Sequence, residues 1–245
     1  MIEPDIPAAV LALLIAASVV GGVIQGAIGF GFALVAVPVL GLVRPDAVPV
    51  TIMFVALPMS LAMAIRERHH IDRPGFVAIM AGRAAGVFLG VAVVLAVPER
   101  SLAIVVGAVV VVAVALSVIG LDLQPRRWLN VGAGVLSGVM GTTAAVGGPA
   151  LAVVYQRRPG PELRSTLALS YLAGLALGLA ALGAVGRVHL WHLVLALILV
   201  PGMFLGLWLA VRLARVLDAA WLRPVVLAFA GIAGLVIVVR AVLEG

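Results

Sequence analysis

A single arginine interrupts a long apolar stretch of the chain. Arg83 lies well inside residues 75–97, whereas every aspartate and glutamate lies in a polar loop or near the end of an apolar run. An ionisable side chain inside a membrane segment is costly and indicates a functional site by default. Because a guanidinium without an acidic partner suits an oxyanion, Arg83 predicts a site for a small anion. The alternative is a structural arginine that extends to a membrane face or contacts backbone carbonyls.

Two glycine-rich clusters, at residues 26–32 and 141–149, can take part in the same chemistry. Glycine lets the backbone leave helical geometry and approach a ligand closely, and a broken helix exposes an N-terminus that favours an anion. The alternative is tight helix packing through small residues. The candidate binding residues in these clusters are Gly29, Phe30, Gly31, Thr142, Thr143, Gly147 and Gly148.

Two polar residues stand beside the clusters. Gln25 and Ser137 occupy matching positions, each directly before a glycine of a repeated Gly-x-x-x-Gly-x-x-Gly pattern. Contact with a ligand and a hydrogen bond between helices are equally compatible with either side chain. We therefore include both among the candidate substrate-binding residues.

The chain contains no cysteine and no lysine. Disulfides, thiolate metal sites and a lysine-dependent phosphate loop are therefore excluded. No pair of carboxylates falls at membrane depth, and no histidine and acidic residues have a metal-binding spacing. We expect no catalytic residue, no metal and no cofactor. An enzyme, or a membrane subunit that binds a partner through arginine-rich loops, remains as an alternative to a transporter.

The composition requires a lipid environment. Hydrophobic residues make up 64% of the chain and charged residues 11%, against roughly half and a quarter in soluble domains. Apolar runs of about 20 residues, the length of a membrane-spanning helix, follow one another with short breaks. We expect an all-α, multi-pass membrane protein in which six ordinary spans cover residues 47–65, 75–97, 101–121, 164–186, 190–211 and 221–243.

The remaining apolar segments, residues 8–43 and 128–156, are interrupted by the glycine clusters. Each precedes three ordinary spans, and Gly86-Val-Phe-Leu-Gly90 matches Gly202-Met-Phe-Leu-Gly206 in the same order. The sequence therefore predicts a duplication, with one membrane repeat at residues 1–122 and a second at residues 123–245.

The arginines predict the orientation of these repeats. All 16 basic residues are arginine, and most fall in four loops that the positive-inside rule assigns to the cytoplasm. Two of these loops flank residues 128–156, so that segment should enter and return from one side. The first broken segment should do the same from the outer face, which inverts the two repeats. In the alternative, both segments cross as kinked helices and the chain crosses eight times.

The doubled motif resembles the signature of the sulfite exporter TauE/SafE family. The first copy runs Gly22-Val-Ile-Gln-Gly26-Ala-Ile-Gly29-Phe-Gly31 and continues to Pro38. A degenerate copy runs Gly134-Val-Leu-Ser-Gly138-Val-Met-Gly141 and continues to Pro149. The resemblance covers nearly the whole chain. It implies a permease of the bacterial inner membrane for sulfite, sulfoacetate or another organosulfonate.

Together these features predict a secondary transporter that holds its substrate between the two broken helices and works by alternating access. A passive channel for inorganic anions or small carboxylates is the alternative within transport. The expected partners are the anionic substrate and the lipid bilayer, with no nucleic acid, and homo-oligomers remain open.

Overall fold

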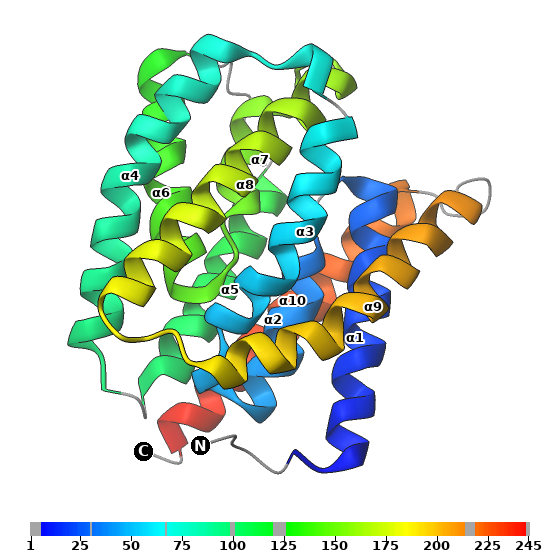
Figure 1. Cartoon of the computed structure of the whole chain (residues 1–245), viewed down its shortest axis with the longest axis vertical. Coiled ribbons are helices and arrows are strands. Elements are labelled where there is room, and N and C mark those ends of the chain that lie inside the picture. The colour runs from blue at the N-terminus through cyan, green and yellow to red at the C-terminus, as the bar shows by residue number, and fades with distance from the viewer. Residues whose placement is uncertain are drawn as a thin grey trace.

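The protein is described from a computed structural model that places residues 6–29, 31–66, 68–98, 101–119, 126–213 and 219–243. Within these residues the chain forms α-helices joined by short turns, with no β-strand (Figure 1). The all-α prediction is therefore confirmed. The helices are α1 (Ala8–Ile28), α2 (Phe32–Val43), α3 (Val50–Arg66), α4 (Arg73–Ala96), α5 (Leu102–Ile119), α6 (Arg127–Ala144), α7 (Gly148–Tyr155), α8 (Gly160–Ala184), α9 (Leu190–Arg212) and α10 (Ala219–Leu243).

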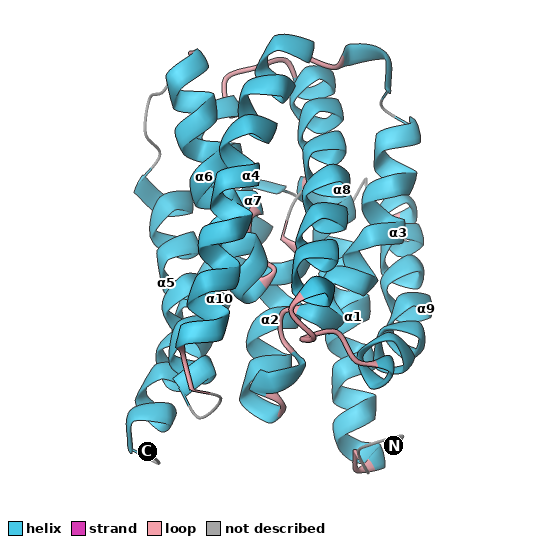
Figure 2. Cartoon of the chain, turned by 60° about the vertical axis from the view of Figure 1, so that its left-hand side comes forward, coloured by secondary structure: helices cyan, strands magenta, loops and turns pink. Residues whose placement is uncertain are grey.

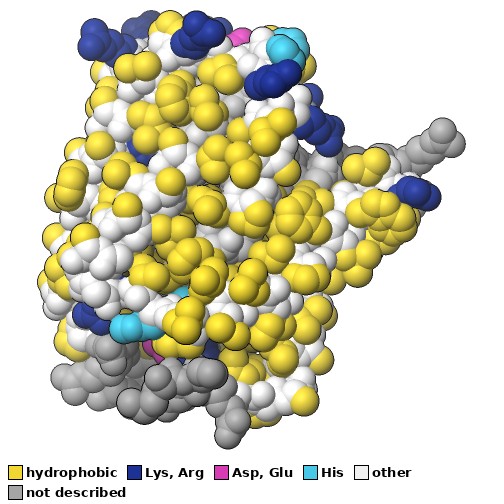
Figure 3. Space-filling view, in the orientation of Figure 1, with side chains coloured by type: hydrophobic (Ala, Val, Ile, Leu, Met, Phe, Trp, Pro, Cys, Tyr) yellow, Lys and Arg dark blue, Asp and Glu magenta, His cyan; other side chains and the backbone are white. Residues whose placement is uncertain are grey.

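Six of these helices, α1, α4, α5, α8, α9 and α10, are long and apolar enough to cross a membrane. Hydrophobic side chains cover the flank of the molecule between its two ends (Figure 3), and many large ones are more than half exposed. An exposed apolar flank of this kind needs lipid around it. Helix α3 has 17 residues, at the short limit for a span. The polytopic membrane fold is therefore confirmed.

Both broken segments reverse direction inside the bundle. Helices α1 and α9 run parallel, since Gly202 lies beside Ile15 and Gly206 beside Val19. The residue after α2, Arg44, lies 5.4 Å over the ring of Trp191 at the start of α9. Helix α1 therefore begins, and α2 ends, at the end of the molecule where α9 begins, as a re-entrant hairpin requires.

The second broken segment enters from the opposite end. Helix α6 packs beside α4 (Figure 2). The two helices run parallel, since Val131 lies beside Gly82 and Thr142 beside Gly90. At the end of α7, the hydroxyl of Tyr155 donates to Asp72 Oδ2 at 2.8 Å, directly before α4. The two hairpins therefore enter from opposite ends, as the inverted arrangement predicts, and the kinked eight-crossing alternative is wrong.

The arginines also separate as expected. Most of the arginines lie near helix ends that meet at one end of the molecule, at the top of Figures 1 and 3. We call this the arginine-rich end. The opposite end carries Arg44, Arg187 and Arg240. Arg100 and Arg215 lie outside the described residues. The arginines of the arginine-rich end are Arg66, Arg68, Arg73, Arg126, Arg127, Arg157, Arg158, Arg164, Arg212 and Arg223.

Glycines bring α4 against α6, and α1 against α9, until their backbones touch. A Cβ atom at Gly86 would meet the backbone of Val135 and Gly138, and one at Gly22 would meet Met203 and Gly206. Each hairpin thus packs most extensively on a helix of the other half. The halves interdigitate, and the predicted boundary between residues 122 and 123 falls outside the described residues.

The register of the repeat differs from the one expected. The first break has Gly29 in a left-handed conformation, and the second has Ala145 there, 116 positions later. The contacts agree, because Gly86 meets Val135 and Gly138 as Gly206 meets Val19 and Gly22, 116 positions before them. The expected matches of Gly22 with Gly134 and of Gly86 with Gly202 are therefore each four residues out of register. Gln25 is thus equivalent to Gly141, and the matching of Gln25 with Ser137 is wrong by about one helical turn.

Candidate functional site

A cavity of about 70 Å³ lies between the two breaks. That volume exceeds the roughly 10–15 Å³ that one water molecule needs. Both hairpins, α3, α4 and α8 contribute to its wall. The structure brings five of the ten predicted residues together here. They are Gln25, Gly31, Arg83, Gly147 and Gly148.

Arg83 supplies the charge of this cavity from the middle of α4. Its side chain is 3% exposed, and neither Nε nor Nη1 has a hydrogen-bond partner. A Cβ atom at Gly141 or Gly147 would lie 3.3 or 3.5 Å from Nη2, and one at Gly174 would overlap Nε and Cζ. Three glycines therefore make the room that the guanidinium occupies. A buried cation with free donors is expected to hold an anion.

Two helix N-termini add to this positive environment. Helix α2 begins after Gly31 and α7 begins after Gly147, and neither has a side-chain cap at its N-cap residue. The first residues of both helices line the cavity. The N-terminal N–H groups and the positive dipole end of a helix favour an anion. None of the residues that line this cavity is acidic.

The first break is held by the side chain of Gln25. Its Oε1 accepts a hydrogen bond from the backbone N–H of Phe32 at 3.1 Å, and its Nε2 donates to the carbonyl of Gly29 at 3.0 Å. The amide thus joins the last turn of α1 to the first turn of α2. Gln25 borders the cavity chiefly as a residue that fixes the break.

The second break lacks an equivalent side-chain connection. The N–H of Ala145 donates to the carbonyl of Gly141 at 2.9 Å, and the N–H of Val146 donates to that of Met140 at 3.3 Å. Ser137 Oγ and Thr142 Oγ1 are buried without a hydrogen-bond partner. Ser137 lies behind Gly147, and Thr142 packs against Gly90 of α4. Both hydroxyls lie close behind the cavity wall rather than on it.

Three predicted residues lie elsewhere. Gly29 packs near the aliphatic part of Arg164, toward the arginine-rich end. Thr143 donates to the carbonyl of Val139 at 2.8 Å and lines a different cavity near the opposite end. Phe30 lies outside the described residues. Their roles in binding stay predictions without support from the central cavity.

Tyr171 is absent from the residues that the sequence predicts for the site, yet it lines the cavity. Its hydroxyl donates to the carbonyl of Gly148 at 3.3 Å. Ser60 of α3 lines the cavity as well. A tyrosine in the middle of an apolar span was the available signal, because a buried phenol needs a polar partner.

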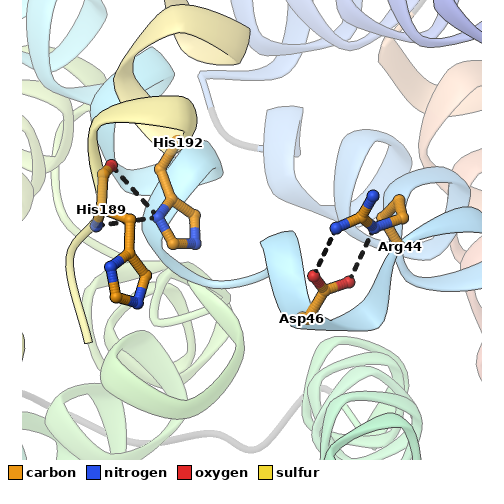
Figure 4. Close-up of polar contacts among 4 residues, drawn as sticks. All are labelled: Arg44, Asp46, His189 and His192. Carbon is orange, nitrogen blue, oxygen red and sulfur yellow. Dashed lines mark hydrogen bonds and ion pairs between the residues drawn. The ribbon is translucent and has the colours of Figure 1, made fainter. Parts of the chain in front are cut away.

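Two further cavities flank the site along the molecule. One, of about 220 Å³ at the end opposite the arginine-rich end, includes Thr143 near the tip of α6 and the groups of Figure 4. There Arg44 binds Asp46 through two hydrogen bonds of 2.7 and 3.0 Å. The other, of about 190 Å³ toward the arginine-rich end, includes Ile28 near the tip of α1. Each hairpin tip thus lies between the central cavity and one end.

The family model described as Sulfite exporter TauE/SafE matches residues 14–237. The match covers most of the 245 residues. The chain belongs to the TauE/SafE family. No curated protein and no solved structure matches it.

Membership makes this TauE/SafE protein a permease-type transporter of sulfite or related anions. Six helices able to span the membrane make it a multi-pass protein, for which the bacterial inner membrane fits the family. Among the described residues, no three histidine or acidic side chains could hold a metal ion.

Proposed function

We propose that this protein is a secondary transporter for sulfite or a small organosulfonate, which binds at Arg83 between the two hairpins. The observation that carries the proposal is a fully buried guanidinium with two unpartnered nitrogens, facing a cavity with two helix N-termini. The guanidinium would bind two sulfonate oxygens side by side. Backbone N–H groups of α2 and α7 would bind from the other sides.

The size and wall of the cavity support a small substrate. Its volume of about 70 Å³ suits one compact oxyanion. Phe32, Met59 and Leu175 provide apolar surface beside the charged group, which could hold a short carbon chain. Sulfite and short organosulfonates share the anionic sulfur group and differ in that chain.

Uptake of labelled sulfite into proteoliposomes tests the substrate and the site together. Saturable uptake that short sulfonates block is expected of the unmodified protein. Arg83→Ala should reduce binding at least a hundredfold, because it removes several hydrogen bonds to a charged group. Arg212→Ala, at the end of α9, removes the same charge elsewhere. Arg83→Ala protein that is folded and binds sulfite normally would refute the assignment.

Counterflow separates a carrier from the channel alternative. A carrier loaded with unlabelled sulfite accumulates the label transiently, because each turnover exchanges one bound anion for another. A channel shows no such exchange. Linear, unsaturated flux without counterflow would contradict the proposed mechanism.

Alternating access can be followed with single cysteines, because the chain has none of its own. Thr143→Cys reports on the cavity at one end and Ile28→Cys on the cavity at the other. Substrate should raise labelling by a water-soluble thiol reagent at one position and lower it at the other. Equal changes at both positions would argue against rocking of the two halves.

A further inference from the structure

A second positively charged cavity lies at the arginine-rich end, between the first turns of α4 and α6. Its volume is about 630 Å³. Arg73, Arg127 and Arg158 reach it from three separate segments: α4, α6 and the turn after α7. Trp128, which is 67% exposed, lies next to Arg127. Exposed tryptophan and arginine at a helix end mark the boundary between lipid and water.

Asp72 also lines this groove and offsets only one of the three arginine charges there. Asp72 Oδ1 accepts from the N–H of Gly75 at 3.1 Å, and Oδ2 accepts from Tyr155. Arg158 has a partly exposed ion pair with Glu162 at 3.4 Å, which is weak at a surface. In the described part of the chain, Arg73 and Arg127 have no ion pair. The positive dipole ends of α4 and α6 add to the field.

A buried polar atom in the groove points to a ligand that can also donate a hydrogen bond. Asn130 is 4% exposed, lines the groove, and has an Oδ1 without a hydrogen-bond partner. A buried acceptor left without a donor is costly. An alcohol on the ligand would satisfy it, whereas a bare phosphate dianion would not.

The wall below the arginines is apolar. Val77 is 64% exposed, and it lines the groove with Ala81 and Val131. These side chains lead from the charged mouth along the flank of α4 and α6, where an acyl chain would lie.

We propose that this groove binds an anionic glycerophospholipid whose headgroup carries a hydroxyl. The lipid phosphate contacts Arg73, Arg127 and Arg158, the headgroup hydroxyl donates to Asn130, and one acyl chain follows Val77 and Ala81. Basic pockets between transmembrane helices on the cytoplasmic side recognise lipid headgroups in this way. The arginine-rich end is the end that the positive-inside rule assigns to the cytoplasm.

The purified protein in detergent can be titrated with phosphatidylglycerol and with phosphatidylcholine. Retention of single lipid molecules is measured by native mass spectrometry, and thermal unfolding by tryptophan fluorescence. Phosphatidylglycerol should bind and raise the unfolding temperature, and phosphatidylcholine should not. Arg73→Gln with Arg127→Gln should weaken retention roughly thirtyfold, a factor of about five for each arginine.

The matched control is Arg66→Gln with Arg68→Gln, which removes the same charge from the same end but outside the groove. Retention by this control should equal that of the unmodified protein. Equal losses in both double variants would show a general surface charge effect and overturn the site. Phosphatidylglycerol retention that survives Arg73→Gln with Arg127→Gln would overturn it as well.

Two further experiments test whether the groove binds a whole lipid or only a soluble phosphate, and whether Asn130 recognises the headgroup. Glycerol 3-phosphate, which has the same charged group without acyl chains, should not raise the unfolding temperature at concentrations that saturate with lipid. An equal effect would assign the groove to a soluble phosphate and overturn the lipid proposal. Asn130→Ala should remove the preference for phosphatidylglycerol over phosphatidic acid. An unchanged preference would overturn the role of Asn130.

Discussion

The two broken segments border the same cavity but differ in how their breaks are supported. The first has glycines with positive φ at 29 and 31, and Gln25 bonds both sides of the break. The second has a left-handed alanine, Ala145, and the hydroxyls of Ser137 and Thr142 near it lack partners. Side-chain hydrogen bonds from its own hairpin therefore hold the first break, whereas the second break has buried hydroxyls without hydrogen-bond partners.

The charge is distributed in the same unequal way. Arg83 of α4 lies against the second break, while the equivalent position of α9, 120 residues later, is Met203, because Gly22 faces Met203 as Gly138 faces Arg83. Met203 is an uncharged side chain, fully buried in the hydrophobic core. The comparison teaches that the duplicated scaffold supplies two similar breaks, and that only the second faces a buried cation.

The largest expected effect comes from displacing that cation. In Gly174→Ala, the added methyl overlaps the guanidinium of Arg83, which must leave its position. Sulfite transport should fall tenfold to a hundredfold, in line with weakened hydrogen bonds to a charge. In the control Gly178→Ala, on the same helix, the methyl meets the flexible end of Met53 at 3.0 Å and lies at an ordinary contact distance of 3.7 Å from Thr142 Oγ1. Equal transport by both variants would separate Arg83 from the substrate.

Removing the polar side chains of the two breaks should have opposite effects. Gln25→Leu leaves the buried N–H of Phe32 without an acceptor, which costs about 1–3 kcal/mol. Ser137→Ala removes a hydroxyl that bonds nothing, so the substrate-free protein should keep or gain stability. Thermal unfolding of both variants measures the difference. A Ser137→Ala protein as unstable as Gln25→Leu would contradict the unequal support of the breaks.

Substitutions at Gly29 and Ala145, the two residues with left-handed backbone conformations at the breaks, should change stability by a smaller amount. Gly29→Ala has space, since the nearest side-chain atom to the added methyl is Arg164 Cγ at 3.8 Å. Its cost is therefore conformational, about 1–2 kcal/mol. Ala145→Gly relieves the same strain but increases the entropy of the unfolded chain by about 0.4–1 kcal/mol. Its unfolding temperature should stay level or rise slightly, and a clear fall would show that the Ala145 methyl is needed for packing.

The ion pairs at the exits of the two hairpins should contribute least. Burial raises the pKa of Asp46, but the hydrogen bond and charge of Arg44 outweigh it and hold the pKa below 3.8. Its stabilisation is present above the unfolded pKa and is lost as pH falls through the lower folded value. Asp46→Asn should therefore cost about 1 kcal/mol or less near neutral pH, and the cost should disappear once the pH falls below the folded pKa of Asp46. Glu162→Gln, at the longer pair, should cost less still.

Much of the fold could be predicted from single stretches of sequence. Apolar runs, arginine-rich loops and the two interrupted segments indicated helices, crossings and hairpins, because hydropathy and charge act locally at each membrane boundary. Arg83 was identified for the same reason, since a charge in an apolar run is visible without neighbours.

The repeat register could not be predicted in the same way. A shift of four residues is close to one helical turn, so it places a stripe of glycines on nearly the same face. The sequence pattern therefore matched Gln25 with Ser137, although the breaks themselves are 116 positions apart. Only the packed backbone shows where each helix ends.

The amino-acid sequence by itself determined the membrane environment, the opposed entry of the two hairpins and the buried cation. The tertiary structure decided which side chains share a cavity with that cation. Tyr171 joined the site, whereas Gly29 and Thr143 lie toward opposite ends. The physical reason is that a span specifies its own insertion, while the face it turns to each neighbour depends on helices that are distant in the chain.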